Sequence, residues 1–209
     1  MSFSSLKTNT FAKSAFSYLE RLQGCFDKTN LEATEKLAHE LHRVWVDGRN
    51  VYICGNGGSA ANAIHIANDL HYGIGACGSG KQLPGLRVEA LSANSGILTC
   101  LANDTGYDNI FSHQLEVKSQ RNDLLIALSG SGNSPNIVKA LTTANQIGLE
   151  TFAILAFDGG QCKEVAKTPI HFAINDMQIA EDAQLVVGHL CMQWLNSNKP
   201  GQIKPLNDG

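Results

Sequence analysis

Short apolar segments alternate with stretches of helical periodicity along most of the chain, and this alternation constrains the fold more than any other feature. Apolar runs of this length, bounded by turn residues, are typical of β-strands. Strands that alternate with helices form βαβ units, in which the strands pair in parallel and helices cover both faces. The sequence therefore predicts an α/β fold with a mostly parallel, doubly wound sheet, whose strands are expected at 51–54, 88–91, 124–128, 152–155 and 170–174.

Amphipathic helices are predicted before and after the sheet. Residues 6–24 and 31–47 carry apolar side chains three and four positions apart. The last helix is expected to begin near Asn175 or Asp176, either of which can cap it, and to continue through Leu195. With 209 residues the chain has material for one domain. We expect N-terminal helices at 1–48 that pack on the sheet and between subunits, a sheet domain at 49–196, and a loose tail at 197–209.

The charge and hydropathy of the chain exclude several kinds of partner. A formal net charge of -3 with 17% charged residues gives no basic face that could neutralise a nucleic-acid backbone. No apolar stretch approaches the roughly 20 residues of a membrane span, and the polar start lacks the apolar core of a signal peptide. We therefore expect a cytoplasmic protein that binds neither nucleic acid nor a membrane.

Two loops rich in glycine and serine directly follow predicted strands. GNGGS at 55–59 follows the strand VYIC, and SGSGNS at 129–134 follows the strand LLIAL. Ligands of doubly wound sheets bind at the carboxyl ends of the strands. Glycine lets the backbone approach a ligand, and the free N–H groups at the start of the following helix attract an anion. The two loops therefore predict a neutral cradle for a phosphate monoester that needs no lysine.

Other interpretations of these loops are weaker. Glycine and serine dominate ordinary turns, so one such loop alone would indicate little. GNGGSA at 55–60 also fits a relaxed dinucleotide pattern, but the next strand ends in Leu91 and Ser92, without the acidic residue that binds ribose. GACGSGK at 75–81 matches a P-loop pattern, but Gln82 replaces the residue that binds magnesium. We expect neither kind of nucleotide site.

Two histidines and two carboxylates form a pattern typical of a metal site. His65 and Asp69 are four residues apart on the helix after the first loop, so both project from one face. Glu181 and His189 lie on the last helix among apolar neighbours, where an isolated charge would be unfavourable. Taken singly, each is more often a satisfied polar group. Together they indicate zinc or a similar divalent ion.

The spacing on the last helix leaves two arrangements open. Glu181 and His189 are eight residues apart, which in a regular helix gives about 12 Å of rise and roughly 80° of rotation. One helix does not easily bring both side chains to one ion. Either the helix begins irregularly near Glu181, or the two ligands reach one site from neighbouring subunits. The second arrangement implies a site at an oligomer interface.

Four segments together resemble the phosphoheptose isomerases, which are sugar isomerase (SIS) domain proteins. They are GNGGSAANAIHIANDL, CLANDTGYDNIF, ALSGSGNSPNIVKAL and AEDAQLVVGHL, and the similarity runs from about residue 30 to 195. The resemblance implies an αβα sandwich with a five-stranded parallel, flavodoxin-like sheet, N-terminal helices, and a homotetramer with sites between subunits. Members of the family convert sedoheptulose 7-phosphate to D-glycero-D-manno-heptose 7-phosphate, the first committed step toward the heptose of lipopolysaccharide, capsule or other glycans.

The resemblance also implies which residues form the site. In the family a serine-rich cradle holds the phosphate, neighbouring polar residues contact the sugar chain, and one residue set binds zinc. The positions expected to bind substrate are Asn56, Gly57, Gly58, Ser59, Asp104, Ser129, Gly130, Ser131, Ser134 and Glu181. The positions expected to bind zinc, or a similar divalent ion, are His65, Asp69, Glu181 and His189.

Three positions depart from the family pattern. The family usually carries Glu and Gln where this chain has Asp69 and Glu181. It also tends to carry an arginine just after the first metal-binding helix, where this chain has Gly73; Lys81 and Arg87 are the candidates to replace it. These substitutions leave the predicted fold unchanged and bear on the identity of the sugar.

The implied reaction is an aldose–ketose isomerisation through a cis-enediol, with Asp69 and His189 as the acid–base pair. One alternative is a non-catalytic SIS module that binds a sugar phosphate or a protein, as the replication-initiator-associating relatives do. Another is an isomerase of a different sugar phosphate. The presence of both His65 and His189 favours an enzyme over a binding module.

Overall fold

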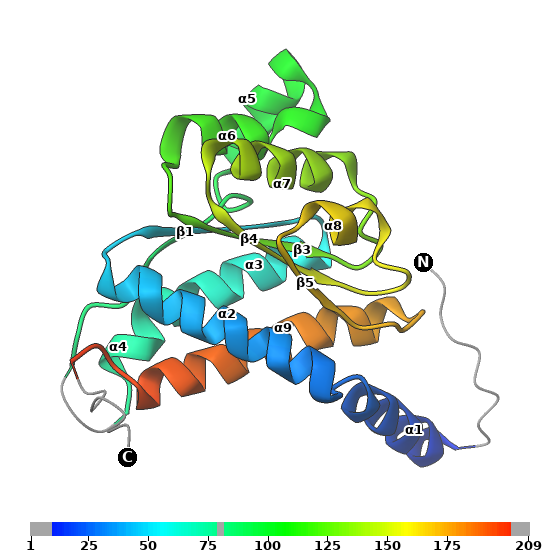
Figure 1. Ribbon diagram of the computed structural model, residues 1–209. Helices are drawn as coiled ribbons and strands as arrows, with labels where there is room; N and C mark the ends of the chain where they lie inside the picture. Colours follow the sequence, from blue (N-terminus) through cyan, green and yellow to red (C-terminus); the bar gives the residue numbers. More distant parts are fainter. Residues whose placement is uncertain (1–9, 79–81, 202–209) are drawn as a thin grey trace.

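The predicted strands form one parallel sheet. The computed structural model describes residues 10–78 and 82–201. Its sheet has five strands in the order β2-β1-β3-β4-β5, and every neighbouring pair is parallel. This confirms the predicted α/β sandwich (Figure 1). The strands are β1 (Asn50–Gly55), β2 (Arg87–Ala90), β3 (Leu124–Ser129), β4 (Glu150–Leu155) and β5 (Thr168–His171).

The last strand departs most from its predicted bounds. It was expected at 170–174 but spans Thr168–His171. Beyond its end the N–H of Phe172 still donates to the carbonyl of Leu155, whereas the N–H of Ile174 donates to the carbonyl of Phe172, so the chain turns there. Phe172 is nevertheless buried. The apolar pattern therefore marked burial correctly and strand geometry only in part.

Helices cover both faces of the sheet because side chains along a strand point alternately to either face. Val51 and Ile53 of β1 belong to one apolar core, and Tyr52 and Cys54 belong to the other. The first core is covered by α2 (Lys28–Val46), α3 (Gly58–Asn68) and α9 (Met177–Ser197), and the second by α6 (Ser112–Lys118), α7 (Pro135–Ile147) and α8 (Gly160–Val165) (Figure 1).

Capping side chains explain where helices α9 and α2 begin. Asp176 accepts hydrogen bonds from the backbone N–H groups of Gln178 and Ile179, which confirms it as the cap of α9. Asp27 accepts from the N–H of Asn30, so α2 begins three residues before its predicted start at 31. Of the predicted helix at 6–24, α1 (Phe11–Gly24) is described, and residues 1–9 lie outside the described part of the chain.

The start of the predicted C-terminal tail is packed against the molecule. Helix α9 continues through Ser197, and Lys199 is buried with its Nζ donating to the carbonyl of Gly75 at 3.1 Å. Residues 202–209 lie outside the described residues. None of the helices that the structure describes is long and apolar enough to span a membrane.

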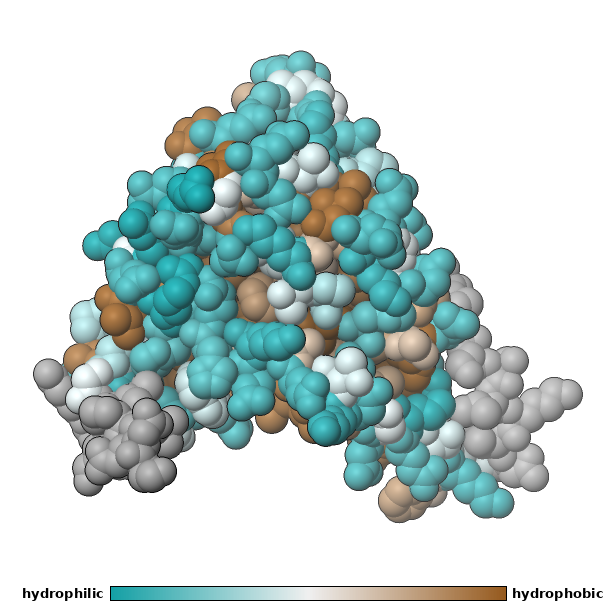
Figure 2. Space-filling model, in the orientation of Figure 1, coloured by the Kyte–Doolittle hydropathy of each residue, from teal (hydrophilic) through white to brown (hydrophobic). Residues whose placement is uncertain are grey.

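Helix α1 lies at the edge of the molecule and contributes no buried side chain (Figure 1). Two polar contacts hold it to α9: Tyr18 donates to Asp182 at 2.5 Å, and Arg21 pairs with Asp176 at 2.7 Å. Its apolar side chains Phe11, Phe16 and Leu19 are exposed. Elsewhere the face seen in Figure 2 is largely hydrophilic, with apolar residues in small groups. Helix α1 is therefore attached by these polar contacts and by Leu22, which packs against the first core, while its outer apolar side chains stay exposed.

Short helical segments complete the connections. The chain after α3 continues without a break into a π-helix, η1 (Asp69–Gly73), and then α4 (Ile74–Ala76). After β2 come α5 (Ser95–Thr105), which also buries no side chain, and a 3₁₀ turn, η2 (Tyr107–Asn109). Helix α5 stands at the end of the molecule farthest from α1 (Figure 1).

The strand order places the two glycine-rich loops next to each other. The chain leaves β1 toward α3 on one face of the sheet and leaves β3 toward α7 on the other, although β1 and β3 are neighbours. At such a switch point the connections diverge and open a crevice at the carboxyl ends of the strands. Both loops therefore border this crevice.

Candidate functional site

A cavity of about 250 Å³ lies at the switch point between β1 and β3. Leu128 and Met177 contribute apolar surface, and the rest of its lining comes from residues predicted to bind substrate. Of those predicted residues, only Asp104 does not line it. The predicted residues that do are Asn56, Gly57, Gly58, Ser59, Ser129, Gly130, Ser131, Ser134 and Glu181.

The first loop turns sharply at Gly57 and brings Gly58 close to the last helix. Gly57 has a φ of 57°, in the left-handed region that favours glycine. A Cβ on Gly58 would lie 2.3 Å from Oε1 of Glu181, so the carboxylate rests directly against the backbone at the start of α3. The partial positive charge of a helix N-terminus stabilises a carboxylate there. Glu181 is thereby held at the wall of the cavity.

The second loop presents hydroxyl groups at the start of α7. Ser129 Oγ accepts from the N–H of Gly132 at 3.1 Å, and Ser131 Oγ accepts from the N–H of Asn133 at 3.3 Å. Ser134 occupies the N-cap position of α7, but its side chain makes no capping hydrogen bond. Because each accepting hydroxyl still has its own hydrogen to donate, the loop offers several donors to an anion.

Asn56 is held by hydrogen bonds to two side chains that were not predicted to be part of the site. Its Nδ2 donates to Oδ1 of Asn136, whose Nδ2 donates back to Oδ1 of Asn56, both at 2.9 Å. The hydroxyl of Tyr107 donates to the same Oδ1 at 3.0 Å. Asn136 lies in the first turn of α7 and is 1% exposed. The only signal for it was a polar residue directly after the second loop.

His65, Asp69 and His189 come together at the junction of α3, η1 and α9. The Nε2 atoms of the two histidines are 3.0 Å apart, and each is 3.5 Å from Oδ2 of Asp69. Among the described residues these three form the group whose donor atoms could hold a metal ion. The histidine side chains are about half exposed, at 51% and 47%. The three donors are thus open to solvent on one side.

A close approach of two helices makes this meeting possible. A Cβ on Gly188, next to His189, would lie 2.7 Å from Cγ1 of Ile66, next to His65. Glycine at 188 therefore lets α9 approach α3 closely enough for the imidazoles to meet. Asp69 begins the π-helix η1, a kind of irregularity that is frequent at functional sites.

Within one chain Glu181 is not part of the group formed by His65, Asp69 and His189, so its role as a ligand stays a prediction for the arrangement in which neighbouring subunits share a site. Helix α9 is continuous from Met177, so no irregular start brings Glu181 back toward His189. Eight residues of regular helix separate the two side chains by about 12 Å along the axis. Within one chain Glu181 instead lines the cavity, as expected of its other predicted role, substrate binding.

Asp104 lies away from the cavity in this chain. It is exposed near the end of α5, where its carboxylate accepts from Asn103 Nδ2 at 2.7 Å and from Cys100 Sγ at 3.5 Å. The predicted contact of Asp104 with the sugar is therefore not formed by one chain alone.

Glycine at position 73 leaves room for the end of the Met192 side chain. A Cβ there would lie 2.8 Å from the terminal methyl of Met192, which fills the space next to η1. Arg87 and Lys81 were the candidates to replace the missing arginine. Arg87 is the first residue of β2, so it lies at the amino end of that strand, whereas the crevice lies at the carboxyl ends. Within one chain Arg87 therefore cannot take the place of the arginine. Lys81 lies outside the described residues.

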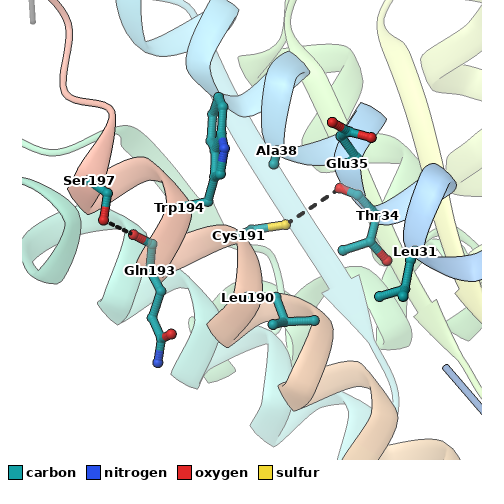
Figure 3. A pocket seen from close by; sticks show the side chains of 9 residues that line it. All are labelled: Leu31, Thr34, Glu35, Ala38, Leu190, Cys191, Gln193, Trp194 and Ser197. Carbon is teal, nitrogen blue, oxygen red and sulfur yellow. Dashed lines mark hydrogen bonds between the residues drawn. The ribbon is translucent and has the colours of Figure 1, made fainter. Parts of the chain in front are cut away.

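A larger cavity of about 450 Å³ lies between α2 and α9 (Figure 3). Its only charged lining residue is Glu35, and no glycine-rich loop at the start of a helix borders it. Cys191 Sγ there donates to the carbonyl of Thr34 at 3.9 Å, as the dashed line in Figure 3 shows. None of the predicted site residues lines it. The smaller cavity, with its hydroxyl and backbone donors, is therefore the candidate sugar phosphate site.

Cys54 directly precedes the first loop, and burial raises the pKa of its thiol. The thiol stays protonated at neutral pH, and a protonated thiol is a poor nucleophile. The chemistry of the site must therefore come from the imidazoles, carboxylates and hydroxyls.

Comparisons with known proteins agree with this site. A family model of the SIS domain matches residues 11–156. Phosphoheptose isomerase of Chlorobaculum parvum is 35% identical over 86% of this chain and 85% of its own length. The structure of phosphoheptose isomerase from Neisseria gonorrhoeae superposes with a TM-score of 0.80 over 89% of this chain and 96% of that one, at 25% identity.

The same fold occurs in regulators. The sugar isomerase domain of an RpiR transcription factor from Sphaerobacter thermophilus has a TM-score of 0.63 at 18% identity, covering 92% of this chain and 93% of that one. This likeness extends to the fold alone. The sequence identity and the coverage of the curated relatives decide between the two groups: this chain belongs to the SIS domain family and, within it, to the phosphoheptose isomerases.

Proposed function

We propose that this chain isomerises sedoheptulose 7-phosphate to D-glycero-D-manno-heptose 7-phosphate, a step in heptose biosynthesis. The observation that carries the proposal is that α3 and α9 each contribute both to the phosphate-binding cavity and to the group of His65, Asp69 and His189. A phosphate held in the cavity would place the rest of a sugar chain along the same two helices. The family membership supplies the reaction.

The phosphate and the sugar chain are expected to bind to different parts of the cavity. The hydroxyls of Ser59, Ser129, Ser131 and Ser134 and the start of α7 attract the phosphate, because donors and a helix N-terminus stabilise an anion. Glu181 is an acceptor and repels phosphate. We therefore assign Glu181 and Asn56 to hydroxyl groups of the sugar.

The three-donor group fits a zinc ion. In a tetrahedral zinc site with nitrogen and oxygen ligands near 2.0–2.1 Å, neighbouring donor atoms are about 3.3 Å apart. The observed separations are 3.0, 3.5 and 3.5 Å. Three protein ligands leave a fourth position open, as in catalytic zinc sites. His65, Asp69 and His189 would hold such an ion, which polarises a carbonyl when bound.

Asp69 and His189 are the proposed acid–base pair. The carboxylate of Asp69 takes a proton from C1 of the ketose, and the same proton returns to C2 of the enediol. The imidazole of His189 gives a proton to the C2 oxygen and accepts one from the C1 hydroxyl through Nδ1, because its Nε2 faces the other two donors of the group; the aldehyde then forms at C1. A carboxylate and an imidazole suit these transfers near neutral pH.

We also propose a homotetramer with sites between subunits. The exposed apolar residues Phe11, Phe16 and Leu19 of α1 support it, since single chains rarely expose several large apolar side chains on one helix. The exposed position of Asp104 on α5 further supports it: Asp104 reaches a substrate only if it serves the site of another chain. Light scattering of the purified protein measures the assembly directly.

The decisive experiment follows sedoheptulose 7-phosphate by NMR with the wild type and with Asp69→Asn and His189→Ala. We expect turnover by the wild type and a loss of about 10²–10⁴-fold in each variant, the usual effect of removing a general acid or base. His113→Ala, which removes a half-buried histidine on α6 that contacts Glu116, is the matched control and should retain activity. Undiminished turnover in both site variants would end this assignment of roles.

The two alternatives make different predictions in the same assay. A non-catalytic sugar-phosphate-binding or protein-binding module would bind a sugar phosphate without turnover and would purify without bound metal. An isomerase of another sugar phosphate would leave sedoheptulose 7-phosphate unchanged but convert a shorter or longer ketose phosphate. Metal analysis together with a panel of ketose phosphates separates the three outcomes.

A further inference from the structure

The hydroxyl of Ser59 can help to bind a phosphate only if its hydrogen points into the cavity. A serine hydroxyl has one hydrogen to donate and two lone pairs that accept. Ser59 is 5% exposed and lines the cavity. Among the described residues, no acceptor for its hydrogen is found, whereas its Oγ accepts from Gln184 Nε2 at 3.0 Å. The group that faces Ser59 from α9 therefore decides which way this hydrogen points.

The orientation of the Gln184 amide is set by Asn62. Oε1 of Gln184 accepts from Asn62 Nδ2 at 3.0 Å, and the same Nδ2 donates to the backbone carbonyl of Glu181 at 2.9 Å. A backbone carbonyl can only accept. The Nδ2 of Asn62 must therefore face both the carbonyl of Glu181 and the side chain of Gln184. As a result the Gln184 amide turns its oxygen toward Asn62 and its nitrogen toward Ser59.

Burial keeps this chain of hydrogen bonds in one arrangement. Gln184 is 1% exposed and Asn62 is 9% exposed. Reversing either amide would bring two donors or two acceptors together away from water, which is unfavourable. Neither residue lines the cavity. Their effect on a ligand must pass through Ser59.

We infer that Asn62 and Gln184 are positioning residues that fix Ser59 as a hydrogen-bond donor toward the phosphate of the substrate. The carbonyl of Glu181 orients Asn62, Asn62 orients Gln184, and Gln184 donates to Ser59. The hydroxyl hydrogen of Ser59 is therefore directed into the cavity. The site thereby favours a ligand group that only accepts hydrogen bonds, such as a fully ionised phosphate. The inference rests on the proposed sugar phosphate site.

Gln184→Met tests this relay because methionine has a similar size but gives Ser59 no donor. We expect the Kd for inorganic phosphate, measured by ³¹P NMR titration, to rise about tenfold, since hydrogen bonds to charged groups are the stronger ones. The KM for sedoheptulose 7-phosphate should rise by a similar factor with kcat within about twofold, because binding of the remote phosphate is equal in ground and transition states. Gln193→Met, at an exposed glutamine on the same helix, should change neither constant.

A double-mutant cycle with Ser59→Ala shows whether the effect passes through Ser59. The relay predicts that Ser59→Ala with Gln184→Met loses no more phosphate affinity than Ser59→Ala alone. An unchanged Kd in Gln184→Met, or losses that multiply in the double variant, would overturn it. If Gln184→Met does not fold, Asn62→Leu removes the donor that orients Gln184, and it should weaken phosphate binding about threefold; an unchanged Kd there also overturns the relay.

Phosphate binding and isomerisation are measured separately, so the two proposals can fail separately. Wild-type protein that binds phosphate without converting the sugar would overturn the proposed reaction, while a weaker Kd in Gln184→Met would still support the relay. Wild-type protein that does not bind phosphate would overturn the relay.

Discussion

The proposed phosphate-binding cavity and the proposed metal-binding group of His65, Asp69 and His189 share two helices but are built in different ways. The cavity is formed by backbone turns and serines such as Ser59 and Ser129, each 5% exposed. The metal-binding group consists of two histidine side chains about half open to solvent and an aspartate side chain that is 23% exposed. The first is therefore fixed when the chain folds, whereas the second depends on the approach of two helices and on an ion.

Removal of the metal should affect the metal-binding group strongly and the cavity not at all, which is the largest expected difference between the two. We expect a chelator to lower turnover of sedoheptulose 7-phosphate by about 10²-fold or more, because the acid–base pair then loses the ion that orients it. Inorganic phosphate should still bind with an unchanged Kd by ³¹P NMR, since none of the three donors lines the cavity. Restored activity on adding zinc is the control. A parallel loss of phosphate binding would show that the two regions are not independent.

Gly132→Ala should damage the cavity and spare the metal-binding group. Gly132 has a φ of 66°, and a Cβ there would lie 2.0 Å from the carbonyl oxygen of Gly159. Strain and overpacking together should lower the free energy of unfolding by about 2–4 kcal/mol, measured with urea. The KM should rise about tenfold.

The matched control for Gly132→Ala is Gly24→Ala, where the added Cβ has no neighbour within 4 Å. Its free energy of unfolding should stay within about 1 kcal/mol of the wild type. Zinc affinity should be unchanged in both variants. Equal stability of the two variants would contradict the close approach of Gly132 to Gly159.

Gly188→Ala should have the smallest effect of these changes. It should weaken the metal-binding group and spare the cavity, the opposite of Gly132→Ala. The new methyl group would press on Ile66 and push α9 away from α3. The free energy of unfolding should fall by about 1 kcal/mol, because overpacking is partly offset by the better helix propensity of alanine. Zinc affinity should fall about tenfold, as when a ligand loses its support. Unchanged zinc affinity would show that this helix contact does not position His189.

The sequence was sufficient for the features that depend on local pattern. The alternation of apolar segments predicted the parallel sheet, and its order brings the loops at 55–59 and 129–134 together. Asn175 and Asp176 were both candidates for the cap of α9 because capping needs only a side-chain acceptor before the first turn, and Asp176 is the one that caps it. His65 and Asp69 share a helix face because they are four residues apart.

Buried polar contacts between distant helices escaped the sequence-based predictions. Asn62, Asn136 and Gln184 each lie on a helix where a polar side chain looks like any solvated one. Their importance comes from partners 80 to 125 residues away in the chain. The position of Glu181 has the same origin: its residue type suggested a ligand, but within one chain the direction of α9 places it at the cavity.

By itself the sequence determined the sheet, the two glycine- and serine-rich loops at the ends of neighbouring strands and the residue types that could bind a metal, because these follow from periodicity, glycine content and short spacings. Only the tertiary structure decided that His65, Asp69 and His189 meet while Glu181 lies at the other site. It also decided that Gln184 sets the hydroxyl of Ser59. The physical reason is that such contacts depend on how closely α3 and α9 pack, and a single glycine at 188 permits that packing.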